Sequence, residues 1–428
     1  MRKMIHSGVE WIGSVPASWQ TSTIGSLFKV RNEKVNDTDY PPLSVTKGGI
    51  VPQMENVAKS DANDNRKMVL ANDFVINSRS DRKQSCGVSP LDGSVSLINT
   101  VLYPAKGAPI VSAYLNYLLK NYGFAEEFYR WGHGIVADLW TTRWQEMKSI
   151  LLPMPSVEEQ QQILDTISEQ TDKIDVLIAN VQAQIEKLKA YKQSVITEVV
   201  TKGLDSAVPM KDSGVDVYPS VPEHWNVQKT LTTLTMPITD GPHTTPELLP
   251  EGIPFVSAEA VSCGNGSIDF DHIRGFISQE FYDECSKKYV PQMNDIYMIK
   301  SGATTGRVSV VDTDRIFTIW SPLAVFRCNP DVVYFRFLYY FLQSTAYQRQ
   351  VQFGWTYGTQ QNIGMRTLER LKVFIPPLDE QYAIVEWLDA KCLQADRLIA
   401  IKQEKIEKLQ QYKRSLIYEY VTGKKEVS

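Results

Sequence analysis

The sequence predicts an α+β protein in which two pseudo-symmetric globular α/β domains are separated by two long helices that form an antiparallel coiled coil. Two observations predict this fold class: one long helical segment occurs twice, and each copy follows a globular segment with a similar order of elements. The copies span 155–201 and 376–422, and they align without a gap at a spacing of 221 residues, with about 20 identities over roughly 47 positions. One polypeptide therefore imitates a two-fold dimer.

The two long segments have the pattern of coiled-coil helices. Apolar residues recur at steps of three and four, and neither segment contains an internal Pro or Gly. Each segment starts after a proline and has acidic residues in its first turn, which suits the positive end of a helix dipole. About 44 helical residues would extend to about 65 Å, whereas an ordinary helix has only about 11–12 residues. The apolar positions are Ile163, Ile167, Ile174, Ile178, Val181, Ile185, Leu188, Val195 and Val199, and in the second segment Ile384, Leu388, Ala395, Ile399, Ile406, Leu409 and Leu416.

A second repeat precedes each globular segment. Ser7-Gly8-Val9, Ser14-Val15-Pro16 and Trp19 recur as Ser213-Gly214-Val215, Ser220-Val221-Pro222 and Trp225. The repeating unit is therefore a head, a globular segment and a long helix. Because the first head lies at the N-terminal end, we expect it to pack near the C-terminal long helix. This contact would complete a ring-like pseudo-symmetry of the two repeating units.

The globular segments share an order of predicted elements. A strand follows an Asn-Asp pair, further strands come next, and then an amphipathic helix, a Gly-aromatic loop and a short helix and strand lead into the long helix. The loops differ more than this scaffold, as two modules with different targets would require. The expected elements span 74–76, 96–103, 110–130 and 144–153 in the first copy, and 296–299, 308–311, 316–326, 331–350 and 368–375 in the second.

Composition limits the class of protein. With 428 residues, 43% hydrophobic and 22% charged, the chain has the composition of a globular protein with two to four domains. No apolar run approaches the roughly 20 residues of a membrane span, and the N-terminal residues lack a signal-peptide core, so we expect a cytoplasmic protein. The five cysteines form no C-x-x-C pair, which indicates neither a disulfide framework nor a zinc cluster.

The net charge of −4 argues against a protein that coats nucleic acid, although it does not exclude local basic faces. The first globular segment has a small excess of positive charge, whereas the first long helix has an excess of negative charge. We therefore expect any phosphate-binding surface to be a local patch that lies off the long helices.

The chain resembles the specificity subunits of type I restriction–modification systems. The resemblance rests on the two Ser-Gly-Val…Val-Pro…Trp heads, on the helix starts at Glu159-Gln160 and Glu380-Gln381, and on the Ile-Glu-Lys-Leu-x-x-Tyr-Lys helix centres. The run 240–246, followed by 252–255, is also typical of one kind of target-recognition domain in that family. Each motif alone is weak, but their duplication in order over nearly the whole chain is specific.

The resemblance implies that residues 1–152 and 206–374 are target-recognition domains, each reading one half of a split, asymmetric site in double-stranded DNA. It implies that residues 153–205 and 375–428 are spacer helices that dock two methyltransferase subunits, which methylate adenine at N6. Two ATP-dependent restriction subunits join that core in some systems. The specificity subunit itself is expected to be non-catalytic, without a metal or cofactor of its own and without a membrane contact; S-adenosylmethionine, ATP and Mg belong to its partners.

The residues give no sign of catalysis in the chain itself. A base-flipping adenine methyltransferase needs an Asn/Asp-Pro-Pro-aromatic loop, and neither 329–331 nor 89–91 fits. The run 301–307 has the glycines of a phosphate loop but not its Gly-Lys-Ser/Thr ending, and the histidines have no metal-ligand spacing. A self-sufficient DNA-modifying enzyme and a coiled-coil adaptor that binds only proteins stay as alternatives.

Candidate DNA-reading residues are Arg, Lys, Asn, Gln and small polar side chains on the loops, because these carry the donors and acceptors that pair with base edges and phosphates. A solvated surface turn is the alternative for each loop, and Arg143, between two Trp residues, could equally pack. In the first globular segment the candidates are Arg79, Arg82, Lys83, Gln84, His133 and Arg143; in the second they are His243, Thr244, Thr245, Lys300, Thr304, Arg307, Tyr357, Thr359, Gln360 and Gln361. The amide-rich loop at 359–362 is the strongest of these, since amides pair bidentately with adenine.

Overall fold

The structure is a computed structural model that describes residues 2–53, 64–79, 82–134, 140–357 and 361–427, without the side chains of Thr356 and Tyr357. It contains two compact units. Unit 1 consists of 1–182 and 403–428, and unit 2 consists of 183–402. Each unit therefore combines one globular segment with a stretch of both long helices, and the units do not coincide with the four segments expected from the sequence.

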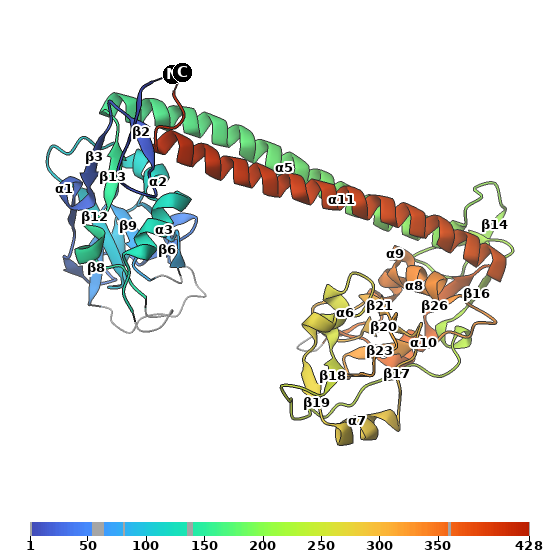
Figure 1. The fold of residues 1–428 in the computed structure, drawn as a ribbon. Coiled ribbons are helices and arrows are strands. Elements are labelled where there is room, and N and C mark those ends of the chain that lie inside the picture. The colour runs from blue at the N-terminus through green and yellow to red at the C-terminus, as the bar shows by residue number, and fades with distance from the viewer. Residues whose placement is uncertain (1, 54–63, 80–81, 135–139, 358–360, 428) are drawn as a thin grey trace. The chain divides into compact units, whose positions relative to one another are not determined.

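The globular part of unit 1 is built on a four-stranded antiparallel sheet (Figure 1). Its order is β10 (Cys86–Val88), β9 (Phe74–Asn77), β12 (Asn99–Pro104) and β4 (Phe28–Val30). The smaller sheets are β11 (Gly93–Val95) with β8 (Arg66–Val69) and β5 (Lys34–Val35), β6 (Leu43–Thr46) with β7 (Gly49–Pro52), β1 (Met4–His6) with β2 (Ser14–Pro16), and β13 (Leu151–Met154) with β3 (Gln20–Thr23). The short helices are α1 (Ile24–Leu27), α2 (Leu115–Leu118), α3 (Tyr122–Arg130) and α4 (Trp144–Met147).

Unit 2 repeats the four-stranded sheet in the order β17 (Thr239–Asp240), β23 (Leu323–Phe326), β20 (Ile296–Ile299) and β21 (Val308–Val310). Its other pairs are β14 (Met210–Asp212) with β15 (Ser220–Pro222), β16 (Asn226–Lys229) with β26 (Lys372–Ile375), and β24 (Thr356–Tyr357) with β25 (Gln361–Asn362). A separate sheet consists of β19 (Gly275–Ile277), β18 (Ile253–Val256) and β22 (Thr318–Ile319), with β18 and β22 parallel. The helices are α6 (Ala258–Cys263), α7 (Gln279–Ser286), α8 (Phe335–Gln343), α9 (Thr345–Phe353) and α10 (Met365–Arg370).

The Asn-Asp turn before β9 and β20 is the same in both units. Asn72 and Asn294 adopt positive φ angles of 73° and 70°, which Asn tolerates better than most residues. Asp73 and Asp295 are buried, and each carboxylate accepts a backbone N–H from three residues earlier, at 2.9 Å from Leu70 and from Gln292. Two segments of different sequence thus form one local structure.

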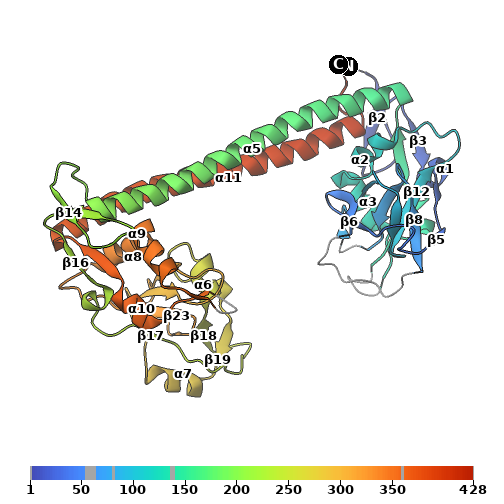
Figure 2. The same ribbon diagram turned by 180° about the vertical axis from the view of Figure 1, so that it is seen from behind.

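The long helices are α5 (Val157–Lys202) and α11 (Leu378–Val421), close to the spans that the apolar periodicity predicts. In unit 1 the start of α5 packs with the end of α11 around Ile163, Ile167 and Leu416. In unit 2 the end of α5 packs with the start of α11 around Val199, Ile384 and Leu388. Within each unit the two helix segments lie side by side (Figures 1 and 2), so each core joins a globular segment to both helices.

Two reciprocal ion pairs connect α5 and α11. Lys192 donates to both oxygens of Asp396 at 2.8 and 2.7 Å, and Lys413 donates to both oxygens of Asp175 at 2.6 Å. The four residues are equivalent at a spacing of 221, so each Asp-Lys pair is the exchanged copy of the other. Lys192 lies one heptad after Ile185 in the apolar stripe, where a lysine fixes the register of a coiled coil at some loss of stability.

A buried glutamine joins each long helix to its globular segment. Gln160 donates to the carbonyls of Pro109 at 2.7 Å and Pro155 at 3.1 Å, and it accepts the N–H of Val111 at 2.9 Å. Gln381 makes the equivalent bonds to Val332 at 3.1 Å, Pro376 at 2.8 Å and the N–H of Tyr334 at 2.7 Å. Both glutamines are fully buried, and the Gln-for-Gln identity of the repeat therefore has a structural reason.

The N-terminal head packs against the end of α11, as the sequence predicts. The Tyr418 hydroxyl donates to the carbonyl of Trp11 at 2.7 Å, and Arg2 donates to the carbonyl of Lys425 at 3.3 Å. The heads also bind their own long helices, because the indole of Trp19 donates to Glu159 at 2.8 Å and that of Trp225 to Glu380 at 3.1 Å.

The prediction of one continuous amphipathic helix over 110–130 and one over 331–350 is wrong in both copies. The first is interrupted between α2 and α3, and the second between α8 and α9. At each break a polar side chain caps the following helix: Asn121 accepts the N–H of Phe124 at 3.0 Å, and Ser344 accepts that of Tyr347 at 3.3 Å. Asn and Ser favour this capping position, which the apolar periodicity alone does not reveal.

Candidate nucleic-acid interface

In unit 1 the loop after β9 is joined to the segment that precedes α4. Thr142 donates its N–H to the carbonyl of Ser78 at 3.0 Å, and Arg79 forms an isolated β-bridge with Thr141. Thr141 also exchanges two backbone hydrogen bonds with His133, at 2.9 and 3.0 Å. Arg79 and His133, predicted from separate stretches of sequence, are thus held next to one strand-like segment.

Unit 2 has the same junction. Ile363 donates its N–H to the carbonyl of Lys300 at 2.9 Å, and Ser301 forms an isolated β-bridge with Asn362. Gly302 donates to the carbonyl of Gln361 at 3.0 Å. The loop after β20 and the amide-rich segment, two of the predicted reading segments, therefore lie together, and their pairing corresponds to that of unit 1 at spacings of 221 and 222 residues.

The remaining candidate DNA-reading residues of unit 1 differ in whether their side chains are exposed or bound to other residues of the unit. Arg79, Arg82 and Arg143 are exposed, and Arg143 also caps α4. Lys83 is engaged within the domain, because its ammonium group contacts Glu126 at 3.0 Å and lies 4.3 Å from the ring centroid of Tyr129. Gln84 has a φ of 62° and donates to the carbonyl of Lys120 at 3.5 Å.

In unit 2, His243, Thr244 and Thr245 are exposed in the loop after β17, whereas Thr304 is half-buried. Arg307 is exposed and donates to the carbonyl of Ser262 at 3.2 Å. Gln361 is exposed in β25. Tyr357 lies in β24, but its side chain, together with Thr359 and Gln360, lies outside the described residues. All of these assignments stay predictions.

A buried carboxylate gathers two lysines and a histidine in unit 2. Asp240 is only 1% exposed, and its Oδ1 accepts from Lys288 at 2.6 Å. Its Oδ2 lies 3.2 Å from Nε2 of His243 and 3.3 Å from Nζ of Lys300, although neither contact has the geometry of a hydrogen bond. One carboxylate thus connects the His243 loop with the Lys300 loop and leaves the cluster with an excess of positive charge, which suits an anionic ligand.

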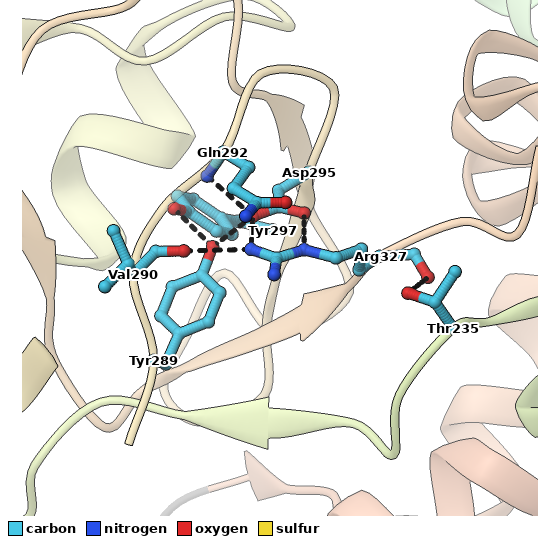
Figure 3. A network of polar contacts seen from close by, with 7 residues as sticks. All are labelled: Thr235, Tyr289, Val290, Gln292, Asp295, Tyr297 and Arg327. Atoms are coloured by element: carbon cyan, nitrogen blue, oxygen red, sulfur yellow. Dashed lines mark hydrogen bonds and ion pairs between the residues drawn. The ribbon is translucent and has the colours of Figure 1, made fainter. Parts of the chain in front are cut away.

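The segment after the turn that carries Lys288 is anchored by a second polar network (Figure 3). Tyr289 donates to Oδ2 of Asp295 at 2.5 Å, and Arg327 binds both oxygens of Asp295 at 2.8 and 2.7 Å. The hydroxyl of Tyr297 lies 2.9 Å from that of Tyr289. Burial raises the pKa of Tyr289 well above its ordinary value, so this hydroxyl keeps its proton and remains a donor to the carboxylate.

Sequence reasoning missed three parts of this surface. Thr141 and Lys288 have no local motif that marks them, because their role follows from contacts with residues far away in the chain. Asp240 belongs to a noted motif, but its burial among cations was not predicted. Among the residues that the structure describes, no group of three His, Cys, Asp or Glu side chains is placed to hold a metal ion. None of the described helices is long and apolar enough to span a membrane.

Comparisons with known proteins agree with this architecture. A model of the family described as type I restriction modification DNA specificity domain matches residues 242–411. The chain is 23% identical to a putative type I restriction enzyme MjaX specificity subunit of Methanocaldococcus jannaschii, covering 96% of this chain and 95% of that protein. It is also 25% identical to the EcoBI specificity subunit of Escherichia coli over 59% of this chain and 53% of that protein.

A solved chain, from work on complex assembly and conformational transition of the type I R-M system, has a TM-score of 0.65 and 16% identity, with coverage of 95% of this chain and 98% of that one. This structural likeness shows the fold alone, which is of the mixed α/β class. In sequence the chain is similar to DNA specificity subunits of type I restriction–modification systems, and the model of that family matches residues 242–411.

Proposed function

We propose that the chain is the non-catalytic subunit that reads a bipartite, asymmetric site in double-stranded DNA, with one half-site for each globular segment. The observation that supports this proposal most strongly is the junction described above, in which two backbone frameworks of the same design carry different side chains. Arg79 and His133 stand at the junction of unit 1, and Lys300 and Gln361 at that of unit 2. Different donors and acceptors on one framework are what reading of two unlike half-sites requires.

We also propose that the paired helices hold the two reading segments at a fixed separation, with an approximate two-fold relation between the units. The reciprocal ion pairs Lys192–Asp396 and Lys413–Asp175 support this relation, because a two-fold axis exchanges equivalent residues across an interface.

The partners and cofactors follow from the same proposal. Two adenine-N6 methyltransferase subunits, and in some systems two restriction subunits, would complete the complex in the cytoplasm. S-adenosylmethionine, ATP and Mg would then be bound by those partners rather than by this chain.

Exposed apolar side chains on the long helices are the proposed docking positions for the methyltransferases. Leu177 and Tyr191 on α5 are exposed, and so are their equivalents Leu398 and Tyr412 on α11. Leu177 and Tyr191 are separated by two heptads, so they occupy the same heptad position. Large exposed apolar groups that recur in both copies fit a partner that binds twice.

The docking proposal is tested by counting partners. Leu177→Glu or Leu398→Glu alone should leave one methyltransferase per chain in native mass spectrometry, and the double variant should leave none. Val176→Glu is the matched control, because Val176 is also exposed but its equivalent is Arg397. Retention of both partners by the double variant would contradict docking at these positions.

The reading proposal is tested by mapping methylated adenines in cells that express the chain with its methyltransferase. Replacing residues 20–150 with the first globular segment of another family member should change one half-site and leave the other half-site and the spacer unchanged. Changes in both half-sites, or a complex that methylates without sequence preference, would reject the assignment of one half-site to each unit.

The fixed separation is tested by lengthening the helices. Because each helical residue advances about 1.5 Å and each base pair about 3.4 Å, four residues inserted between Ile174 and Lys187, with a matching insertion in α11, should lengthen the unspecified spacer by one or two base pairs. An unchanged spacer with altered half-site bases would reject the role of the helices as a ruler.

A further inference from the structure

Each unit has an open cleft between its globular part and a long helix. The cleft of unit 1 has a volume of about 580 Å³ and lies between the segment around Tyr117–Asn121 and the residues Lys413 and Arg414 of α11. The cleft of unit 2 has a volume of about 350 Å³ and lies between α8 and the residues Lys192 and Gln193 of α5. Neither cleft is lined by the proposed docking residues Leu177, Tyr191, Leu398 and Tyr412.

The two clefts are lined in part by equivalent residues. Lys413 and Arg414 correspond to Lys192 and Gln193 at a spacing of 221, whereas Tyr117 corresponds to Tyr339 at a spacing of 222. Gln84 and Gly306 also correspond, and both have positive φ angles, 62° and 94°. Part of the lining of each cleft is therefore repeated between the two units.

Positive charge predominates in both linings. The cleft of unit 1 is lined by Lys120, Lys413 and Arg414, and that of unit 2 by Lys192 and Arg307. The lysines from the long helices are each paired with an aspartate, so the excess charge comes from the other cations. Neither set of lining residues includes a carboxylate. An anion is the ligand that this charge distribution favours.

The clefts adjoin the proposed reading loops. Gln84, from the loop after β9, lines the cleft of unit 1, and Thr305 and Arg307, from the loop after β20, line that of unit 2. A duplex held by these loops would bring its sugar-phosphate backbone close to the clefts, because phosphates flank every base that is read in a groove.

We propose that the two clefts are an equivalent pair of binding sites for the DNA backbone, one beside each half-site. This inference rests on the proposed function. The two strands of a duplex are antiparallel, so its backbone is itself two-fold symmetric, whereas the sequence of an asymmetric site is not. We therefore expect the positions of the backbone sites to be repeated in both units, and the residues that read bases to differ between them.

This assignment changes one expectation from the charge distribution along the sequence, which placed the phosphate-binding surface off the long helices. The excess of acidic residues in 153–205 describes the segment as a whole. Three basic residues of the long helices nevertheless line the clefts, where each helix faces a globular part: Lys192 on α5 and Lys413 and Arg414 on α11.

The experiment is the salt dependence of DNA binding by the complete complex of the chain with its methyltransferase. Duplexes with and without the mapped site are titrated at several salt concentrations. Lys120→Gln combined with Arg414→Gln should weaken binding to both duplexes by a similar factor, and it should reduce the slope of log K against log salt by about one to two, since each phosphate contact contributes about one. The mapped methylation sites should stay the same.

A gain-of-charge variant tests the equivalence of the clefts, and the introduced arginine keeps an N–H donor for the carbonyl of Gln343, which Gln193 contacts at 2.8 Å. Gln193→Arg places in the cleft of unit 2 the arginine that unit 1 has at position 414, and it should steepen the salt dependence by about one. The controls are Asn180→Arg, an exposed position of α5 that lines neither cleft, and the paired loss of Arg397 and Lys405, two exposed cations of α11 that also line neither cleft. These controls should leave the slope unchanged.

The outcomes separate this inference from the function on which it rests. If the wild-type complex shows no sequence-dependent binding, the proposed function fails. If the wild-type complex binds but the slopes of the cleft variants equal those of the controls, only the backbone sites are wrong. A loss confined to the duplex with the mapped site would overturn the inference by assigning base reading to these residues. The Lys120→Arg and Arg414→Lys variants should retain the wild-type slope.

Discussion

The Asn-Asp turns of the two units are alike in backbone and different in their surroundings. In unit 1, Asp73 is held by Arg31, which follows β4 and stacks over Tyr103 with its guanidinium carbon 4.7 Å from the ring centroid. In unit 2, Asp295 is held by Arg327, which follows β23, a different strand of the corresponding sheet. Only Asp295 also accepts from a tyrosine, Tyr289.

The difference between these two turns shows which features are common to the two repeated units. In both units a buried carboxylate is bound by both nitrogens of an arginine. The arginine follows a different strand in each unit, and the other hydrogen-bond partners of the carboxylate also differ. A buried charge needs a partner and hydrogen bonds, and more than one segment of chain supplies them. The backbone turn is therefore the constant feature, and the side chains around it vary with the loops that each unit carries.

Replacing Asp295 or Asp73 should produce the largest loss in the free energy of unfolding. Asp295→Ala leaves Arg327 and the hydroxyl of Tyr289 without their acceptor, and we expect a loss of about 3–5 kcal/mol in the free energy of unfolding. Asp73→Ala should cost less, because no tyrosine depends on it. Urea unfolding combined with hydrogen exchange of β20 and β9 would measure each unit separately.

Asp271→Ala, at an exposed carboxylate of unit 2, is the control and should change the free energy of unfolding by less than about 0.5 kcal/mol. Equal losses for Asp73→Ala and Asp295→Ala would show that the tyrosines contribute nothing to the difference between the units.

Replacing the buried glutamines should produce an intermediate loss in the free energy of unfolding, and the loss should be similar in both units. Gln160→Ala and Gln381→Ala each leave a part-buried N–H without its acceptor and remove the buried hydrogen bond to a proline carbonyl, and about 1–3 kcal/mol is expected for such a loss. Thermal unfolding of the two variants would check this. Gln161→Ala, at the exposed neighbour of Gln160, should be nearly neutral, and a large inequality between the two glutamine variants would break the equivalence of the repeats.

The smallest effect is expected for the ion pairs between the helices. Lys192 is 25% and Asp396 40% exposed, so Asp396→Asn should cost about 1 kcal/mol or less, and Asp175→Asn a similar amount. The losses should shrink in high salt, because salt screens exposed charges. Melting curves at low and high salt would measure them, with Glu404→Gln, in an exposed pair with Lys408, as the control. Unequal or salt-independent losses would show that packing, rather than charge, dominates.

The long helices were the most predictable part of the fold, because a period of three and four residues sustained over more than forty positions admits few other structures. The head, the strands β9 and β20 and the lead-in to each long helix were also predicted. The breaks at Asn121 and Ser344 were not, since a single capping hydrogen bond decides them within an otherwise continuous apolar pattern.

The candidate interface was predictable only in part. Loop composition indicated Arg79, His133, Lys300 and Gln361, and the structure brings them together in pairs through backbone contacts. The grouping of Lys288, His243 and Lys300 around Asp240 was not predictable, because these residues are separated in sequence and meet only after the sheet and α7 have formed. Periodicity describes one element at a time, whereas such a cluster depends on several.

The exchanged ion pairs of α5 and α11 also mean that pairing of α5 with α11 within one molecule competes with pairing of α5 between two molecules. Asp175 and Lys192 lie on the same helix, so α5 of one molecule offers α5 of another the same complementary charges that it finds on α11. Intramolecular pairing is favoured because α5 and α11 belong to one chain, which gives them a high effective concentration. Concentrated solutions should therefore accumulate domain-swapped dimers, which sedimentation would reveal as a slowly reversible second species.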